Sequence, residues 1–143
     1  FPTVFLVREF TKGDILEAMQ KGRMYCARGD GTDWPTLDLF LVSAGDGADA
    51  VMGETVVTDS PPLIRFRVSH HSGKDAPLRI RLIRGGILIQ TFEGKTPLEV
   101  VYVDNEAPPG AATYYRLLDE KKHLTSNPIF VRYQAGSGAR VSP

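Results

Sequence analysis

Two stretches of alternating apolar and basic residues, followed by a pair of glycines, constrain the fold of this chain most strongly. Over residues 63–70 and again over 78–82, the alternation has the period of two that a half-buried strand requires. Gly85 and Gly86 then precede a third apolar run over 87–92, and glycine accepts the positive φ of a tight hairpin turn. The region therefore predicts strands that cover a core on one face and present arginines to water on the other.

Similar short runs recur along the rest of the chain, at spacings of about 8 to 12 residues and divided by glycine and proline. The further strands are expected at 3–7, 23–27, 37–42, 55–57, 98–103, 113–118 and 128–133. This pattern predicts an all-β fold, an immunoglobulin- or fibronectin-like antiparallel β-sandwich with one short N-terminal α-helix. The helix is expected to begin after Thr11, whose hydroxyl can cap the amide of Asp14, and to end at Gly22.

The chain divides into three parts. Residues 1–28 are interpreted as an N-terminal strand and helix that pack either on the sandwich or on an upstream barrel, and residues 29–134 as the β-sandwich domain. Residues 135–143 are small, have no hydrophobic period and are expected to form a disordered tail. Because the sequence begins at Phe1 and lacks the pattern of a signal peptide there, we expect it to be part of a longer polypeptide.

Composition excludes few functions, but it argues against binding to nucleic acid and against association with a membrane. The 17 basic residues balance the 17 acidic ones, so no net charge would attract nucleic acid or an anionic membrane. Apolar runs are far shorter than the roughly 20 residues of a membrane-spanning helix. The single cysteine, Cys26, cannot form an internal disulfide, and the cellular compartment therefore stays undecided.

Histidine and aspartate motifs do not predict a metal site. His70 and His71 are neighbours on a strand and point to opposite faces, while His123 is isolated in sequence. The Asp-Gly-x-Asp motifs at 30–33 and 46–49 favour turns, because neither continues into the glutamate of a calcium-binding loop. We therefore predict no metal ligand in this chain.

Nucleotide and covalent chemistry are also unsupported. Residues 45–50 match the letters of a dinucleotide-binding motif, but no helix follows that could receive a phosphate, so a hairpin loop is expected. Cys26 lies in a predicted strand, where a structural thiol is commoner than a reactive one. We predict no catalytic residue, no cofactor-binding residue and no cofactor, and hence no enzyme activity of this chain alone.

Three groups of residues remain as candidates for binding. The first is a set of arginines that could pool on one sheet face and bind an acidic partner or a sugar phosphate, or could merely be solvated: Arg65, Arg67, Arg79, Arg81 and Arg84. The second is a set of aromatic residues that could line a carbohydrate-binding face: Trp34, Tyr102 and Tyr115. The third could reach into a neighbouring active site: Tyr25, Arg28 and His123.

One tyrosine is a candidate for a structural role. Tyr114 lies near the start of a late strand, a few residues after Pro109 and Gly110. A tyrosine corner would place its hydroxyl on an upstream backbone group, and the alternative is a tyrosine partly buried in the sheet.

Residues 15–26 have a helix, then Gly-Arg, then an aromatic strand, and this order resembles the end of the catalytic barrel in polymerase and histidinol phosphatase (PHP) superfamily metallohydrolases. Residues 82–86 and 126–131 resemble the Leu-Ile-Arg-Asn-Gly hairpin and the last strand of the C-terminal β-sandwich that some members carry. The resemblance extends over residues 3–132, but the glycine pair Gly85-Gly86 lacks the polar residue that the hairpin of those domains has. Family members bind metal through barrel motifs that have no counterpart in this chain.

The resemblance implies a non-catalytic accessory or interaction domain of a larger PHP-like metal-dependent hydrolase, with the upstream catalytic domain as its partner. Homo-oligomers are a further expected mode of assembly. The alternative is a stand-alone β-sandwich module that binds carbohydrate or protein.

Overall fold

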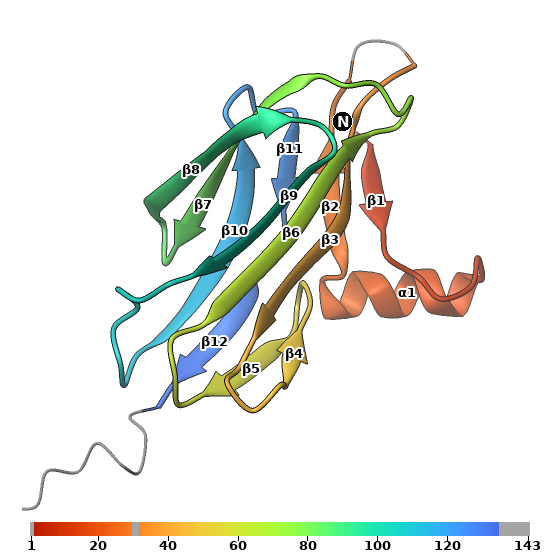
Figure 1. The fold of residues 1–143 in the computed structure, drawn as a ribbon. Coiled ribbons are helices and arrows are strands. Elements are labelled where there is room, and N and C mark those ends of the chain that lie inside the picture. The colour runs from red at the N-terminus through yellow and green to blue at the C-terminus, as the bar shows by residue number, and fades with distance from the viewer. Residues whose placement is uncertain (1, 30–31, 135–143) are drawn as a thin grey trace, which may run out of the picture.

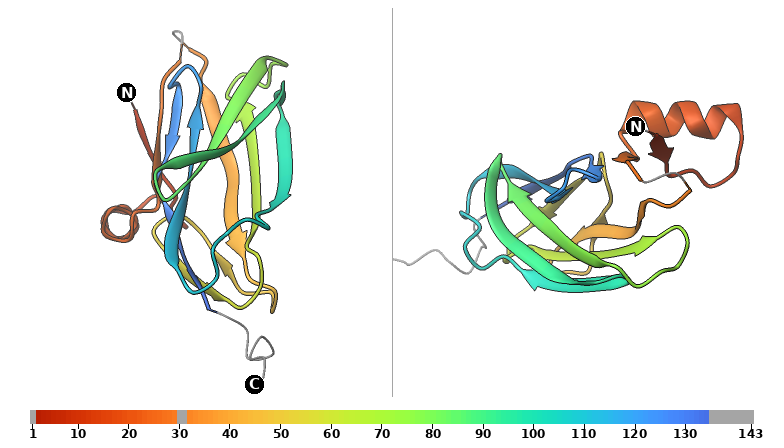
Figure 2. Two further views of the ribbon diagram at one scale, coloured as in Figure 1. Left: turned by 90° about the vertical axis from the view of Figure 1, so that its left-hand side faces the viewer. Right: turned by 90° about the horizontal axis from the view of Figure 1, so that it is seen from above.

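Two β-sheets face each other and enclose the core, while the only helix among the described residues lies outside both layers (Figures 1 and 2). The computed structural model describes residues 2–29 and 32–134. The all-β sandwich predicted from the sequence is confirmed. Its immunoglobulin- or fibronectin-like identity stays a prediction, and the predicted disordered tail at 135–143 lies outside the described residues.

The large sheet has eight strands and the small sheet has four. The strands of the large sheet are β1 (Thr3–Phe5), β2 (Met24–Ala27), β5 (Thr55–Thr58), β7 (Pro77–Arg84), β8 (Ile87–Lys95), β10 (Ala112–Asp119), β11 (Leu124–Ser126) and β12 (Ile129–Tyr133). Those of the small sheet are β3 (Pro35–Ser43), β4 (Asp49–Ala50), β6 (Leu63–His70) and β9 (Leu98–Val103).

The alternating stretches form the strands predicted for them. The apolar residues of β6 and β7 are buried in one cluster between the sheets: Ile64, Phe66, Val68, Leu78, Ile80 and Leu82. Gly85 and Gly86 both have positive φ, 56° and 88°, and close a two-residue turn in which Arg84 pairs with Ile87. Residues 43–49 likewise form the predicted hairpin loop, with Ser43 pairing with Asp49.

The helix α1 (Lys12–Lys21) begins and ends where the sequence predicts. The backbone N–H of Asp14 donates to Thr11 Oγ1 over 3.1 Å, and Gly22 takes the left-handed conformation at the C-terminus. Arg23 N–H then donates to the carbonyl of Ala18, which satisfies an otherwise unpaired helix carbonyl. Local capping therefore sets both ends of α1.

One strand pair departs from the antiparallel pattern, because β5 runs parallel to β12. Residues 59–62 include Pro61 and Pro62, which lack amide donors, and over this segment the chain leaves the large sheet after β5 and enters the small sheet as β6. β5 therefore meets β12 rather than its own sequence neighbour β6.

Two short strands were not predicted, β4 and β11. β11 matters for the architecture because it pairs with both β2 and β10 and so attaches the N-terminal segment to the large sheet. A segment of three residues has too little hydrophobic period to be recognised in sequence.

Candidate functional site

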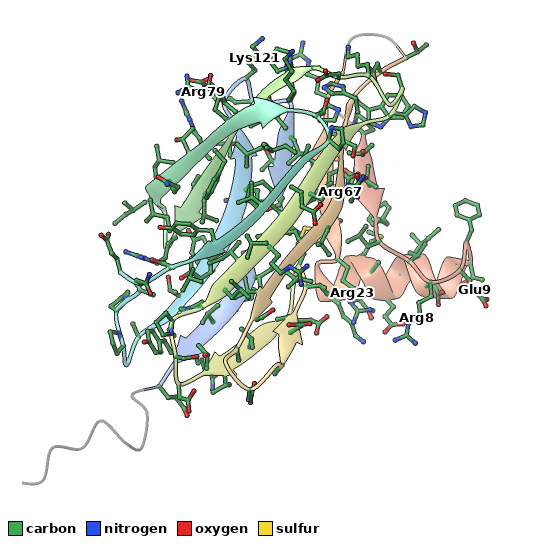
Figure 3. All side chains as sticks on the ribbon, in the orientation of Figure 1. Arg8, Glu9, Arg23, Arg67, Arg79 and Lys121 are labelled. Carbon is green, nitrogen blue, oxygen red and sulfur yellow. The ribbon has the colours of Figure 1, made fainter. Side chains whose placement is uncertain are left out.

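The five arginines do not form one basic face, which excludes the alternative in which they pool to bind an acidic partner or a sugar phosphate. Arg65 and Arg67 lie on β6 of the small sheet, whereas Arg79 and Arg81 lie on β7 of the large sheet. Outward-facing residues of two facing sheets lie on opposite sides of a sandwich. Figure 3 labels Arg67 and Arg79 in these separate places.

The arginines of β7 are also neutralised by acidic neighbours. Arg79 and Arg81 both lie within 3.3 Å of the carboxylate of Glu120, and Arg79 contacts Glu93 as well. The outer face of β7 therefore presents a mixed-charge network and offers no excess of positive charge to a ligand.

The three aromatic residues predicted to line a carbohydrate-binding face do not share a surface. Trp34 stacks on His71 at one end of the sandwich, with ring centroids 4.1 Å apart and ring planes 13° apart. Tyr102 packs edge-to-face on Phe92 at the margin of the core, and Tyr115 is fully buried. These residues cannot form a common platform.

Tyr114 is partly buried in the sheet, the alternative to a hydrogen-bonded corner, and the next residue makes the buried hydroxyl contact. Within the described residues the Tyr114 hydroxyl has no hydrogen bond, and its ring packs on Phe130 at a centroid distance of 6.4 Å. Strand alternation turns Tyr115 inward and Tyr114 outward. The buried hydroxyl contact thus belongs to Tyr115, one residue after Tyr114.

The residues expected to reach a neighbouring active site differ in accessibility. Tyr25 is buried in the core, and burial raises the pKa of its hydroxyl. Arg28 and His123 come together through their backbones, where Arg28 N–H donates to the His123 carbonyl over 2.7 Å. Of the three, Tyr25 is therefore closed to any external substrate in this structure.

A buried charged cluster, which we call the closed cluster, consists of Arg84, Asp104 and Tyr115. It lies where β7 and β9 end and near the start of β10. Arg84 Nη1 and the Tyr115 hydroxyl both donate to Asp104 Oδ2 over 2.7 Å, and the backbone N–H of Glu106 donates to the other oxygen over 3.2 Å. Asp104 is 1% exposed. Burial, with the adjacent Asp104 carboxylate, raises the pKa of Tyr115 far above its usual range. Every strong contact points inward, so the cluster holds the sheets together and offers no binding site.

A second charged cluster lies at the opposite end of the sandwich, where β6 ends; we call it the open cluster, and it consists of Asp33, His70 and Lys74. Asp33 Oδ2 lies 2.9 Å from Lys74 Nζ and 3.4 Å from His70 Nδ1. The backbone N–H of Ser72 donates to Asp33 Oδ1 over 3.0 Å. Hydrogen bonding by Lys74 and Ser72 holds the pKa of Asp33 well below its usual range. Asp33 thereby links the β2–β3 loop to the β6–β7 loop.

The open cluster adjoins two cavities. One of about 330 Å³ is lined by residues from β7, β8 and the β10–β11 turn, including Arg79, Glu120 and His123. The other, of about 240 Å³, is lined by Arg67, Lys74 and Pro97 among others. His70 lines both, so solvent can reach this end of the molecule beside a charged cluster.

Within residues 2–29 and 32–134, no three His, Cys, Asp or Glu side chains are placed to hold a metal ion. Asp46 and Asp49 accept hydrogen bonds from Ala48 N–H and the Ser43 hydroxyl, as turn residues do. Of the other Asp-Gly-x-Asp motif, residues 30 and 31 lie outside the described residues.

The N-terminal segment carries apolar side chains that the sandwich does not cover; we call them the α1 surface, and they are Leu6, Phe10, Leu16 and Met19. Phe10 is 94% exposed, and the other three are 40–49% exposed. α1 packs against β1 and projects beside the two sheets (Figure 2). An adjacent hollow of about 190 Å³ combines Leu6 and Ala18 with charged groups, and Figure 3 labels two of these, Arg8 and Arg23, next to the helix.

The α1 surface is held in a defined position. Asn127 Nδ2 donates to the Gly22 carbonyl over 3.1 Å, and Gly53 N–H donates to Pro128 O over 2.8 Å. A Cβ atom at Gly53 would lie 1.5 Å from Lys21 O, so the backbone there packs directly against the end of α1. The helix is therefore anchored at its C-terminus while its apolar side chains stay exposed.

Comparison with known proteins gives no relative for this chain: no family model, no curated protein and no solved structure matches it. Among the described residues, the structure contains no helix with the length and apolar character needed to cross a membrane.

Proposed function

We propose that this chain is a non-catalytic interaction domain that binds a partner protein surface, or another part of its own polypeptide, through the α1 surface. The observation that supports the proposal is the combination of exposure and anchoring at α1. Several exposed apolar side chains on one short segment are a common feature of interaction sites, and a segment that is already ordered loses little conformational entropy on binding. A helix of ten residues that is apolar on one side also gains stability from such a contact.

The narrower form of the proposal is an accessory domain of a PHP-like metal-dependent hydrolase, whose catalytic barrel would be the partner. This form rests on the resemblance of residues 15–26, 82–86 and 126–131 alone. The α1 surface belongs to the same N-terminal segment that resembles the end of the barrel, and an intramolecular contact of α1 would therefore support the narrower form.

Site-specific photocrosslinking in the cells that make the protein tests the proposal. A benzoylphenylalanine at position 10 is expected to crosslink to one defined partner, or within its own polypeptide, and the added substitutions Leu16→Lys and Met19→Lys should abolish the product. The matched control is the same probe at Ile87, an exposed apolar residue on β8. Equal crosslinking from both positions, or no product from position 10, would refute a specific role for the α1 surface.

The anchoring of α1 can be tested by substituting alanine at two glycines that have similar φ. Gly53 and Gly47 have φ of 85° and 89°, but only Gly53 lies against other backbone atoms. Gly53→Ala is expected to cost about 2 kcal/mol more than Gly47→Ala, because the clash adds to the same backbone strain. It should also open the chain to proteolysis after Lys21. Equal stability of the two variants, measured by urea unfolding, would show that α1 is not held there.

A second candidate function is carbohydrate or protein binding by the outer face of the large sheet. Tyr114 and Phe130 form an aromatic pair beside a groove of about 290 Å³, to which Thr55 and Arg132 also contribute. Aromatic faces and a guanidinium suit a sugar ring that carries an acidic group. Binding on a glycan array that is lost in Phe130→Ala and kept in Val57→Ala would favour this function over the first.

A further inference from the structure

We call the cavity of about 240 Å³ at the end of β6 the β6 pocket. Its charged lining residues are all basic. Its lining consists of Arg67, Ser69, His70, Gly73, Lys74 and Pro97. The lining contains two permanent cations, an imidazole and a hydroxyl, and no carboxylate. This pocket does not involve the α1 surface, so the inference from it does not rest on the proposed function.

The walls of the β6 pocket are fixed by hydrogen bonds and one ion pair. On one side, Asp33 binds both Lys74 and the Ser72 backbone. On the other, the buried Thr96 hydroxyl donates to the Lys74 carbonyl over 2.9 Å and accepts from Ala76 N–H over 3.0 Å. The segment that carries Lys74 is thus held from two directions, and its ammonium group is placed without a ligand.

Two carboxylates, those of Asp38 and Asp33, contact residues of the lining and orient them. Arg67 Nε is 3.8 Å from Asp38 Oδ2, and the Ser69 hydroxyl donates to the same oxygen. Each carboxylate engages only part of the donor capacity of its cation, since a guanidinium carries five N–H groups and an ammonium three. Donors on both Arg67 and Lys74 therefore stay available to a ligand in the pocket.

We propose that the β6 pocket binds a small tetrahedral oxyanion, a phosphate or sulfate group that is either free or part of a small-molecule ester. Arg67 and Lys74 supply charge-assisted hydrogen bonds, and Ser69 and the glycine at position 73 leave room for the anion. Of the five arginines considered from the sequence, only Arg67 lines this pocket.

His70 lines both the β6 pocket and the neighbouring cavity. Its buried Nδ1 atom lies 3.4 Å from Asp33 Oδ2, so the imidazole is held against the open cluster.

Titration of the ¹⁵N-labelled chain with inorganic phosphate, sulfate and glucose 6-phosphate tests the site. Saturable shifts of the resonances of residues 67–74 are expected, with Kd on the order of 1 mM. Arg67→Gln and Lys74→Gln should each weaken binding by about fivefold or more. The control Arg65→Gln, which removes an outward arginine of the same strand that does not line the pocket, should leave Kd unchanged.

The choice of anion separates the two sources of the ligand group. Tighter binding of glucose 6-phosphate than of inorganic phosphate supports an ester, and the reverse order supports a free ion. No saturation by about 50 mM of any of the three, or an equal loss of affinity in Arg65→Gln, would overturn the proposal. Thermal unfolding of each variant establishes that a loss of binding is not a loss of fold.

Discussion

The two ends of the sandwich use similar groups to different effect. In the closed cluster Asp104 binds a cation and a tyrosine hydroxyl, and in the open cluster Asp33 lies between a cation and an imidazole. Asp104 is almost fully buried and its partners point inward, whereas the Lys74 side chain is 55% exposed beside a cavity. Burial and the direction of the remaining donors, rather than residue type, therefore separate a structural cluster from a candidate binding site.

The largest expected effect is the loss of Asp104. Asp104→Ala leaves the Arg84 guanidinium and the Tyr115 hydroxyl without their acceptor in a buried place, and we expect a cost of about 3 kcal/mol or more in the free energy of unfolding. Urea unfolding measures it. The exposed Asp75 serves as the control, since Asp75→Ala should change stability by less than about 0.5 kcal/mol. A cost of Asp104→Ala below about 1 kcal/mol would show that water reaches the closed cluster.

A smaller effect is expected at Tyr115. Tyr115→Phe removes one buried hydrogen bond but leaves Asp104 paired with Arg84, and should cost about 1–2 kcal/mol. Tyr114→Phe is the matched control, because the Tyr114 hydroxyl has no hydrogen bond within the described residues. Equal effects of the two substitutions in chemical denaturation would contradict the contrast drawn between these neighbours.

The smallest effect is expected at the open cluster, where it should depend on pH. The folded protein lowers the pKa of Asp33, so the carboxylate stabilises the fold above its ordinary pKa of about 3.9 and loses this effect as the pH falls through the lowered value. Asp33→Asn should therefore melt below the wild type at about pH 7, and the difference should shrink to nothing in strong acid. A difference in melting temperature that is independent of pH would show that Asp33 acts only by packing.

The fold was largely predictable because its signals are local. The alternation in β6 and β7, the glycine pair at 85–86 and the caps of α1 each depend on a few consecutive residues. The parallel pairing of β5 with β12 was not predictable in this way. It depends on contacts between residues about 75 positions apart, for example Phe130 with Thr55, and no short-range pattern encodes them.

The candidate sites were less predictable, since they depend on which side chains meet in space. His70 was correctly placed on a strand, but the placement of His71 on the same strand was wrong, because β6 ends at His70 and His71 stacks on Trp34. The contact of His70 with Asp33 joins β6 to the β2–β3 loop. The five arginines looked equivalent in sequence and were divided by the assignment of β6 and β7 to different sheets. A possible signal for the α1 surface was the apolar stripe of a helix too short to be stable alone.

The break at Asn127 and Pro128 between β11 and β12 has a consequence for how the protein is made. Residues on its two sides pair with β2 and β5, and Asn127 itself binds Gly22, 105 positions earlier. During synthesis the segment up to Ala27 must therefore wait, with its sheet edge unpaired, until nearly all of the described chain has left the ribosome. The segment of the described chain that is made first is thus among the last parts of it to acquire its neighbours.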